Sequence, residues 1–340
     1  MSSLPYFFAL FFDQQIILRN VQRALLQFFK NCFTSSFYVQ LELCTVHFCI
    51  NSIKGFEKLF ILHVCISYMK KIVLVTGGTS GIGRAICNVL TEHGHVVYGT
   101  GRSIETGQRL DGYTLVQMNV NEDASVKNAV DWLLTKEGKI DVLINNAGTG
   151  MAGSIEDSSV DEIVDIFNTN VAGLIRTCQA VLPAMRSKRV GMIINISSVG
   201  GLMGLPYRGI YCASKSAVET ITESLSQEIM QFGIKAVLIE PGDFKTNINE
   251  NRYVSEKTLQ SDYKSDFERI HRIINEEVAE GDDPELIGRL VAKIIRKKKP
   301  RMRYNVGNTR SKLALSTKRI LRDRWFEKLM MNHYKMKRKP

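Results

Sequence analysis

The sequence predicts an α/β fold, with a single doubly wound parallel sheet of the Rossmann type and helices on both of its faces. Short apolar runs rich in Val and Ile alternate with longer segments of helical pattern between residues 69 and 242. Such alternation is typical of parallel strands joined by crossover helices. A glycine-rich turn, TGGTSGIG, also follows the first apolar run directly, and right-handed crossovers from such a start cover the sheet on both faces.

The elements are expected in a regular order along the chain. The expected strands cover 71–78, 95–102, 114–120, 139–148, 190–198 and 234–242. The expected helices cover 81–94, 122–138 and 158–185, and a last one begins at residue 209. Gly94 and Gly138 stand where two of these helices should end, because glycine readily adopts the left-handed conformation of a helix C-terminus. Residues 69–304 are therefore predicted to form one domain.

The first 68 residues differ in composition from the rest of the chain. They hold eleven of the sixteen Phe and four of the seven Cys, but a single glycine, Gly55. No apolar run there reaches the length of a membrane span without a charged residue. Met69 stands directly before the first predicted strand, so we expect translation to start there and residues 1–68 to be a non-native or disordered extension. A membrane-associating leader is the alternative.

Positive charge is concentrated near the end of the chain. Seventeen of the 45 Lys and Arg lie from Arg296 onward, against two acidic residues, while the formal net charge of the whole chain is +11. Residues 305–340 are predicted to form a basic helical tail. An amphipathic helix there would carry these apolar residues: Ile320, Leu321, Trp325, Phe326, Leu329 and Met330.

Two partners suit such a tail. Its apolar side docks on the domain or on a partner subunit, which we favour, or it lies on an anionic membrane surface. No nucleic-acid-binding motif accompanies the charge, so nucleic acid is not an expected partner.

The cysteines indicate a reducing compartment. Seven cysteines without regular spacing argue against a disulfide framework and suit free thiols in a cytoplasm. Cys44, His47 and Cys49 lie close together in sequence, but no second ligand pair follows at zinc spacing, so no metal site is predicted. We expect a cytoplasmic protein, which becomes membrane-peripheral if the basic tail binds lipid.

Two local patterns indicate chemistry. The stretch GIYCASK places Tyr211 four residues before Lys215 in a predicted helix, so their side chains share a face. Alone, this spacing is most often an exposed surface pair. The glycine-rich turn favours a functional role for this pair. Its residues Gly77, Gly81 and Gly83 stand where a dinucleotide pyrophosphate would approach a helix N-terminus.

Six motifs occur in order along the domain. They are TGGTSGIG from Thr76, NNAG from Asn145, FNTNVAG around Asn170, NISS ending at Ser198, YCASK from Tyr211 and EPGDFKT from Glu240. Together they resemble the short-chain dehydrogenase/reductase family, nearest its branch of retinol and 17β-hydroxysteroid dehydrogenases. The resemblance implies an oxidoreductase that moves hydride between a nicotinamide cofactor and a carbonyl or alcohol, and it implies a homo-oligomer.

The resemblance assigns catalytic roles to four residues. Tyr211 is expected to protonate the carbonyl oxygen during reduction, Ser198 to hydrogen-bond the substrate carbonyl, and Asn170 to anchor a water in the proton relay. Lys215 is expected to hold the nicotinamide ribose and to lower the pKa of Tyr211 from its usual ~10. A cation within about 4 Å is worth roughly 4 kcal/mol at an effective dielectric constant near 20.

The resemblance also outlines a cofactor site. Arg102 follows the second strand, where NAD-preferring enzymes carry an acid, and a guanidinium can grip a 2′-phosphate with two hydrogen bonds. NADP(H) is therefore the expected cofactor, although Asn119 stands where the family usually has Asp. The expected contacts are Gly77, Thr79, Ser80, Gly81, Ile82, Gly83, Arg102, Asn119, Val120, Asn146, Ala147, Gly148, Tyr211, Lys215, Pro241, Gly242 and Thr246.

The substrate is expected to be a small carbonyl compound or alcohol. The family branch suggests an apolar one, whereas the segment 247–281, which would shape the substrate pocket, is rich in charge. Two alternatives belong to other functional classes: a non-catalytic module that binds NADP(H), and a membrane-peripheral protein whose main function lies in its basic tail. The presence of both Tyr211 and Lys215 favours the enzyme.

Overall fold

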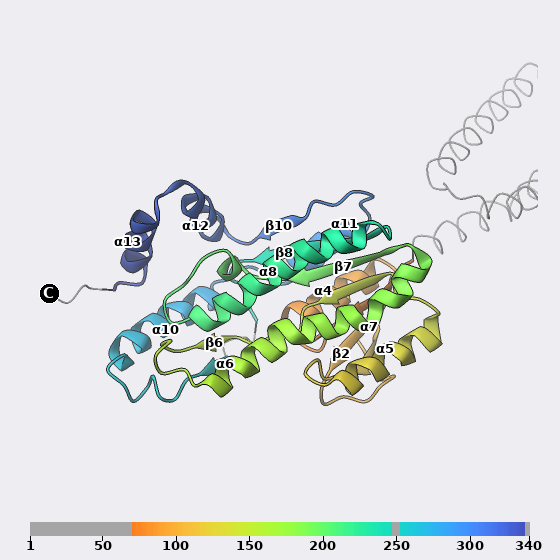
Figure 1. Cartoon of the computed structure of the whole chain (residues 1–340), viewed down its shortest axis with the longest axis horizontal. Coiled ribbons are helices and arrows are strands. Elements are labelled where there is room, and N and C mark those ends of the chain that lie inside the picture. The colour runs from red at the N-terminus through yellow and green to blue at the C-terminus, as the bar shows by residue number, and fades with distance from the viewer. Residues whose placement is uncertain (1–69, 247–251, 337–340) are drawn as a thin grey trace, which may run out of the picture. The chain divides into compact units, whose positions relative to one another are not determined.

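The computed structural model describes residues 70–246 and 252–336 (Figure 1). The expectations for residues 1–68 and for a translation start at Met69 lie outside these ranges. Within them, the dominant element is an eight-stranded sheet with helices packed on both faces, as the sequence predicts.

The strands lie in the order β10-β8-β7-β5-β1-β2-β4-β3. Neighbours pair in parallel, except that β3 runs antiparallel to β4 at one edge. The chain moves from β1 through β2 to β4 and then crosses back to β5, so the sheet has a switch point between β1 and β5, where such sheets bind ligands. The bounds are β1 Ile72–Val75, β2 Val96–Gly101, β3 Arg109–Leu110, β4 Tyr113–Gln117, β5 Val142–Asn145, β7 Gly191–Ile196, β8 Ile234–Pro241 and β10 Arg303–Val306.

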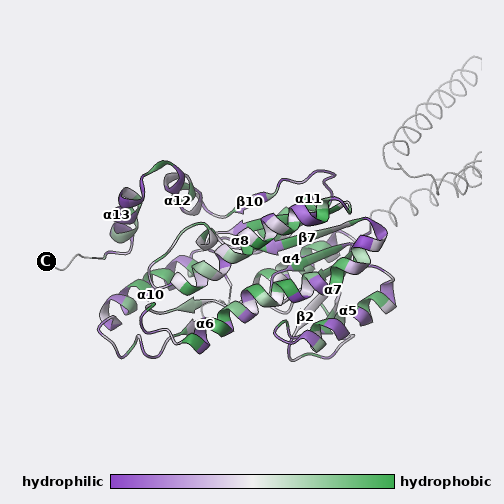
Figure 2. Cartoon of the chain, viewed as in Figure 1, coloured by the Kyte–Doolittle hydropathy of each residue, from purple (hydrophilic) through white to green (hydrophobic). Residues whose placement is uncertain are grey.

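Alternate residues of the strands supply two separate cores, one on each face of the sheet. Ile72 and Leu74 pack with helices α5 (Asp123–Glu137), α7 (Gly173–Lys188) and α8 (Gly209–Met230). Val73 and Val75 pack with α4 (Gly81–Glu92) and α11 (Glu285–Ile294) on the other face. Strands that are apolar on both faces are expected in a parallel sheet covered twice. Figure 2 shows hydrophobic and hydrophilic residues mixed on the covering helices, as expected of helices with one buried side.

The long helix predicted over 158–185 consists of three consecutive segments. α6 spans Val160–Phe167, a π-helical turn spans Asn168–Ala172, and α7 follows without a break. A capping box fixes its start, since the Ser159 hydroxyl accepts from the Glu162 amide and the Glu162 carboxylate accepts from the Ser159 amide. The π-helical turn carries the expected site residue Asn170, and such turns are frequent at functional sites.

Several elements of the structure were not predicted. α10 (Lys264–Ala279) forms within the charged segment expected to shape the substrate pocket. A separate two-stranded sheet pairs β6 (Met151–Ala152) with β9 (Tyr253–Val254). The predicted domain boundary at residue 304 falls inside β10, so the sheet continues beyond it.

The basic tail forms two helices rather than one. α12 spans Thr309–Ile320 and α13 spans Asp323–His333, and the backbone is extended at the two residues between them. Of the apolar residues expected along one helix, Phe326 is buried against the domain in a cluster with Met203 and Leu315, and Met330 is half-buried beside it. The other four, Ile320, Leu321, Trp325 and Leu329, are exposed. The tail therefore docks on the domain through one side only.

Three further observations apply to the part of the chain that the structure describes. Cys87, Cys178 and Cys212 are buried free thiols. No helix there combines the length and apolarity needed to cross a lipid bilayer. No group of three or more His, Cys, Asp or Glu there is placed to hold a metal ion, and the cluster of Cys44, His47 and Cys49 lies outside the described residues.

Candidate active site

The turn between β1 and α4 brings backbone groups into close contact. Gly77 and Gly81 adopt positive φ angles of 66° and 50°, which glycine accepts without strain. A Cβ atom on Gly83 would lie 2.0 Å from the carbonyl oxygen of Gly77, so α4 can approach the turn only with glycine at that position. Ser80 precedes α4 but its side chain does not cap the helix. The turn therefore has the features of a phosphate cradle at a helix N-terminus.

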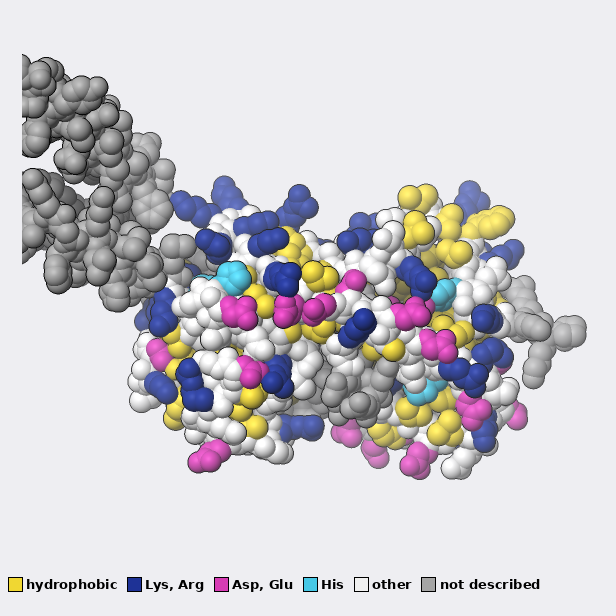
Figure 3. Space-filling view, turned by 180° about the vertical axis from the view of Figure 1, so that it is seen from behind, with side chains coloured by type: hydrophobic (Ala, Val, Ile, Leu, Met, Phe, Trp, Pro, Cys, Tyr) yellow, Lys and Arg dark blue, Asp and Glu magenta, His cyan; other side chains and the backbone are white. Residues whose placement is uncertain are grey.

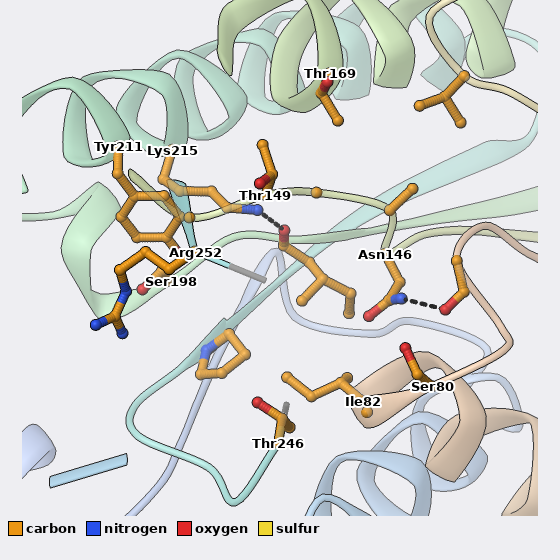
Figure 4. Close-up of a pocket in the computed structure, with 18 of the residues that line it drawn as sticks. Ser80, Ile82, Asn146, Thr149, Thr169, Ser198, Tyr211, Lys215, Thr246 and Arg252 are labelled. Carbon is orange, nitrogen blue, oxygen red and sulfur yellow. Dashed lines mark hydrogen bonds between the residues drawn. The ribbon is translucent and has the colours of Figure 1, made fainter. Parts of the chain in front are cut away.

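Asn146 braces this turn from the end of β5. Its Nδ2 atom donates to the carbonyl oxygens of Thr76 at 3.0 Å and Gly77 at 3.1 Å (Figure 4). In return, Oγ1 of Thr76 accepts from the backbone amides of Asn146 at 3.0 Å and Ala147 at 2.9 Å. These four hydrogen bonds fix the carboxyl ends of β1 and β5 relative to each other at the switch point.

A cavity with a volume of about 520 Å³ opens over the carboxyl ends of the central strands. Ser198, Tyr211 and Lys215 lie at one end of it, and the glycine turn with Ser80 lies at the other (Figure 4). Two of the predicted site residues, Gly83 and Asn170, do not line it. The predicted residues that do are Gly77, Thr79, Ser80, Gly81, Ile82, Arg102, Asn119, Val120, Asn146, Ala147, Gly148, Ser198, Tyr211, Lys215, Pro241, Gly242 and Thr246.

Tyr211 and Lys215 project from the start of α8, and Ser198 follows the end of β7. The Nζ atom of Lys215 donates a hydrogen bond to the carbonyl oxygen of Ile196, 3.0 Å away (Figure 4). A Cβ atom on Gly148 would lie 3.5 Å from the same Nζ, so the ammonium also borders the loop after β5. Burial lowers the pKa of Lys215 to about 8, and the nearby Glu219 opposes this shift.

The electrostatics of Tyr211 differ from the expectation. Burial raises the pKa of Tyr211 above its usual value, while a hydrogen bond with Ser198 and the charges of Arg208 and Arg252 lower it. Arg208 and Arg252 are thus cations that favour the ionised phenol. The predicted net lowering of the Tyr211 pKa by Lys215 is wrong, because burial removes the phenol from water and outweighs the charges.

Asn170 is buried behind the cavity wall. Its Oδ1 atom accepts from the backbone amide of Thr149 at 2.8 Å, and its Nδ2 atom donates to the Thr149 carbonyl and to Oγ of Ser214, both at 3.0 Å. Through these hydrogen bonds, Asn170 joins the loop after β5 to α8. Thr149, which Asn170 holds, lines the cavity. It is neither exposed to solvent nor a capping residue. Its role in anchoring a relay water stays a prediction.

The next question is which charged residues line the cavity near β2. Arg102 follows β2 and lines the cavity. Among the described lining residues the one acid is Asp243, which follows β8. The side chain of Asn119 is engaged within its own loop, since Nδ2 donates to Glu122 at 2.6 Å and Oδ1 accepts from the Asn121 amide at 3.2 Å.

The loop after β8 closes the cavity from the other side. Pro241 ends β8, and a Cβ atom on Gly242 would lie 2.4 Å from Oγ of Ser311 in α12. A Cβ atom on Gly81 would lie 3.4 Å from the Thr246 side chain. Thr246 therefore lies against the glycine turn, and the tail helix α12 supports this loop from behind.

Three charged residues of the cavity were missed by sequence reasoning: Arg208, Asp243 and Arg252. Arg252 donates to Oδ1 of Asn275 on α10 at 2.9 Å, and burial lowers its pKa to about 10. Burial raises the pKa of Asp243. Arg208 lies three residues before Tyr211 and Asp243 belongs to the motif EPGDFKT, so both could have been found from the motifs. Nothing in the sequence places Arg252 beside them.

A buried charge group lies behind β8. Nη1 of Arg303 on β10 lies 3.1 Å from Glu219 on α8, and its Nε lies 3.7 Å from Glu240 on β8. Burial raises the pKa of both carboxyl groups, that of Glu240 to about 7. Because Glu219 lies one turn after Lys215, this group connects the helix of the candidate site to the edge strand.

Comparison with known proteins agrees with this geometry. The sequence profile of the short chain dehydrogenase family matches residues 71–257, more than half of the chain. The chain is 43% identical over 238 residues to a 3-ketodihydrosphingosine reductase of Bacteroides thetaiotaomicron, covering 70% of this chain and 88% of that protein. It is 32% identical over 258 residues to human 17-beta-hydroxysteroid dehydrogenase type 1, covering 69% of this chain and 77% of that protein.

A solved structure that contains NADP+ is also similar to this chain. Serine dehydrogenase in its closed form, complexed with NADP+, is similar to this chain with a TM-score of 0.61 and 25% sequence identity, over 70% of this chain and 95% of that one. The resemblance that the motifs indicated is thereby confirmed, including the likeness to the 17β-hydroxysteroid branch.

Proposed function

This chain belongs to the short-chain dehydrogenase family, and we propose that it is an NADP(H)-dependent reductase that converts a ketone to a secondary alcohol. One observation carries the proposal. Ser198, Tyr211 and Lys215 converge at one end of a cavity whose other end is a glycine turn suited to a pyrophosphate (Figure 4). An oxidoreductase that uses a nicotinamide dinucleotide needs both ends in one cavity.

The chain's residues would act on the oxygen of the ketone. A nicotinamide cofactor held with its pyrophosphate at the glycine turn would supply the hydride for the carbonyl carbon. Ser198 and Tyr211 donate hydrogen bonds to the carbonyl oxygen, and Tyr211 then transfers its proton to that oxygen, a step typically worth about 10²- to 10⁴-fold in rate. Arg208 and Arg252 stabilise the tyrosinate that remains, and Lys215 holds the end of β7 in position. We propose the reductive direction, in which Tyr211 acts as the proton donor.

The cofactor preference rests on Arg102. It lines the cavity directly after β2, where a guanidinium favours a 2′-phosphate and an acid would favour the free ribose hydroxyls. NADPH is therefore the proposed reductant.

The proposed substrate class rests on the residues of the cavity and on the 43% identical relative from Bacteroides thetaiotaomicron. Its name indicates 3-ketodihydrosphingosine, a ketone that carries an amine, a hydroxyl and a long alkyl chain. The cavity offers apolar contacts from Met151, Phe244 and Val278, and the carboxylate of Asp243 for an amine. We propose an amphiphilic ketone of this kind rather than a wholly apolar steroid.

The test is the loss of NADPH absorbance with purified full-length protein and a small set of ketones. We expect turnover of 3-ketodihydrosphingosine with NADPH and little turnover of it with NADH. With NADPH, a steroid ketone should be turned over more slowly than 3-ketodihydrosphingosine. NADPH binding without turnover of any ketone would support the non-catalytic binding module instead. Turnover of the steroid alone would retain the reaction but overturn the substrate class.

We further infer a homo-oligomer that works in the cytoplasm. The family resemblance supports association through the long helices, and the buried free thiols Cys87, Cys178 and Cys212 suit a reducing compartment. Light scattering of the purified protein tests the first inference, and cell fractionation tests the second.

A further inference from the structure

The two tail helices present an apolar surface to solvent. Leu313 and Ile320 lie two turns apart on one side of α12, and Trp325 and Leu329 lie one turn apart on one side of α13, with Leu321 between the helices. Ile320 is 81% exposed, and Leu313 and Trp325 are each 62% exposed. Figure 3 shows hydrophobic side chains gathered over this corner of the molecule, bordered by Lys and Arg. We call these five residues the tail surface.

Positive charge surrounds the tail surface. Residues 309–336 contain eight Lys or Arg and two acidic residues, Asp323 and Glu327, a net charge of +6. One of the two acids is already paired, because Nζ of Lys318 donates to Asp323 at 2.8 Å. The ammonium of Lys328 lies 5.2 Å from the centre of the Trp325 ring. The exposed basic residues are Arg310, Lys312, Arg319, Arg322, Arg324, Lys328 and Lys335.

The opposite side of the tail is held firmly on the domain. Leu315 and Phe326 are buried against Met203 in the loop after β7. Nε2 of His333 lies 2.8 Å from Glu277 of α10, and the Tyr334 hydroxyl accepts a hydrogen bond from Arg208. The exposure of the tail surface is therefore imposed by the fold, and the helices cannot turn it inward without losing these contacts.

We propose that the tail surface binds an anionic lipid bilayer. An amphipathic helix pair with Trp and Leu between basic residues is suited to the boundary between head groups and acyl chains, where Trp is favoured and the basic residues meet lipid phosphates. The charge decides the occupant. A second copy of this surface would bring two strongly basic faces together, whereas an anionic bilayer neutralises them.

This orientation would serve a lipid-like substrate. Arg208 lines the candidate active-site cavity and also contacts Tyr334 directly after α13. The tail that would bind the bilayer is therefore in direct contact with a residue of the cavity. The lipid binding itself does not depend on the proposed reaction, so failure of either proposal leaves the other in place.

The first test uses tryptophan emission from the full chain. The chain has two tryptophans, Trp132 and Trp325, and Trp132 packs edge-on against Tyr98 in the domain. In a Trp132→Phe variant the emission reports Trp325 alone. Vesicles of phosphatidylcholine and phosphatidylglycerol should shift this emission to the blue, and bromine-labelled acyl chains should quench it. Vesicles of phosphatidylcholine alone should have a much smaller effect.

Three outcomes would overturn the proposal. One is an emission of Trp325 that does not respond to anionic vesicles. Another is a response that is equal for both vesicle types at low and at high salt, since screening should weaken the binding at roughly 1 M salt. The third is a blue shift that appears without vesicles and grows with protein concentration, which would identify a second copy as the occupant.

The second test is vesicle flotation with a matched control. A chain carrying Ile320→Ser and Trp325→Ser should float with anionic vesicles at least about fivefold less than the unaltered chain. Val164→Ser and Met230→Ser replace two exposed apolar residues elsewhere on the domain and should leave flotation unchanged. All these proteins carry the same residues 1–69, so a difference between them reports on the tail. Equal loss with both pairs would overturn the proposal.

Discussion

The ammonium group of Lys215 lies 3.0 Å from the carbonyl oxygen of Ile196, so α8 is tied to β7 where that strand ends. Ser198 follows two residues after Ile196, and Tyr211 lies one helical turn before Lys215. This hydrogen bond therefore helps to position the three residues proposed to act on the substrate. The charges that lower the pKa of Tyr211 come from elsewhere, from Arg208 and Arg252.

Replacing Arg252 should change the pH dependence of the reaction. Reduction requires a protonated Tyr211, so its rate falls as the pH rises through the pKa of Tyr211. Arg252 lowers this pKa, so Arg252→Gln should raise it. The fall in the reduction rate should then move to higher pH, and oxidation of the alcohol at neutral pH should slow.

Profiles of kcat against pH in both directions test this prediction. Arg289→Gln, at an exposed position on α11, is the matched control and should leave both profiles unchanged. A profile of Arg252→Gln that coincides with that of the unaltered protein would show that Arg252 does not act on the phenol.

Removing Arg102 should weaken NADPH binding selectively. Hydrogen bonds to charged groups contribute roughly 1.5–3 kcal/mol, so Arg102→Ala should raise the Kd for NADPH by about 10- to 100-fold. The Kd for NADH should change little, because that cofactor lacks the 2′-phosphate. Titrations followed by cofactor fluorescence measure both constants. A similar increase in Kd for both cofactors would mean that Arg102 does not contact the 2′-phosphate.

Gly83 and Gly94 form a matched pair for testing the glycine turn. A Cβ atom on Gly83 would lie 2.0 Å from the Gly77 carbonyl oxygen, whereas nothing lies within 4 Å of a Cβ atom on Gly94. Gly83→Ala should cost about 3 kcal/mol of stability or more, as overpacking does, and should abolish NADPH binding. Gly94→Ala should lose only about 1–2 kcal/mol of stability, because of its positive φ angle, and should bind NADPH normally.

Urea unfolding and NADPH titration of both variants check this pair. The account of the turn would be contradicted by a Gly83→Ala protein that binds NADPH as tightly as the Gly94→Ala protein.

Glu240 should make stability fall as the pH rises toward neutrality. Burial raises its pKa from the ordinary value of 4.5 to about 7, so in this window the folded chain binds more protons than the unfolded chain. The free energy of unfolding therefore decreases between pH 4.5 and about pH 7 on account of this group. Glu240→Gln should flatten that part of the stability curve.

Thermal unfolding across this pH range measures the effect. Glu256→Gln, at an exposed position, is the control and should keep the slope of the unaltered protein. If stability varied with pH in Glu240→Gln as it does in the unaltered protein, titration of the Glu240 carboxyl group in this range would be ruled out.

The sheet and the ends of the cavity could be predicted from sequence because local signals determine them. Apolar runs mark buried parallel strands, and the glycine turn and the motif around Tyr211 follow strand ends that must meet at the switch point. Arg252 could not be placed, since its position depends on a contact with Asn275 of α10, which no local sequence signal indicates. The pKa of Tyr211 was wrongly predicted because sequence spacing shows which charges are near but not how deeply a phenol is buried. The break between α12 and α13 also has no glycine or proline to announce it.

The most direct measurement follows deuterium from cofactor to product. NADPH labelled with deuterium at the transferable C4 position is incubated with 3-ketodihydrosphingosine and the full chain, and the alcohol is analysed by mass spectrometry. The unaltered protein should give alcohol that carries the deuterium at the former carbonyl carbon. Tyr211→Phe should still bind NADPH but form this product about 10²- to 10⁴-fold more slowly. Absence of labelled alcohol from the unaltered protein, or equal rates from both proteins, would contradict the proposed function.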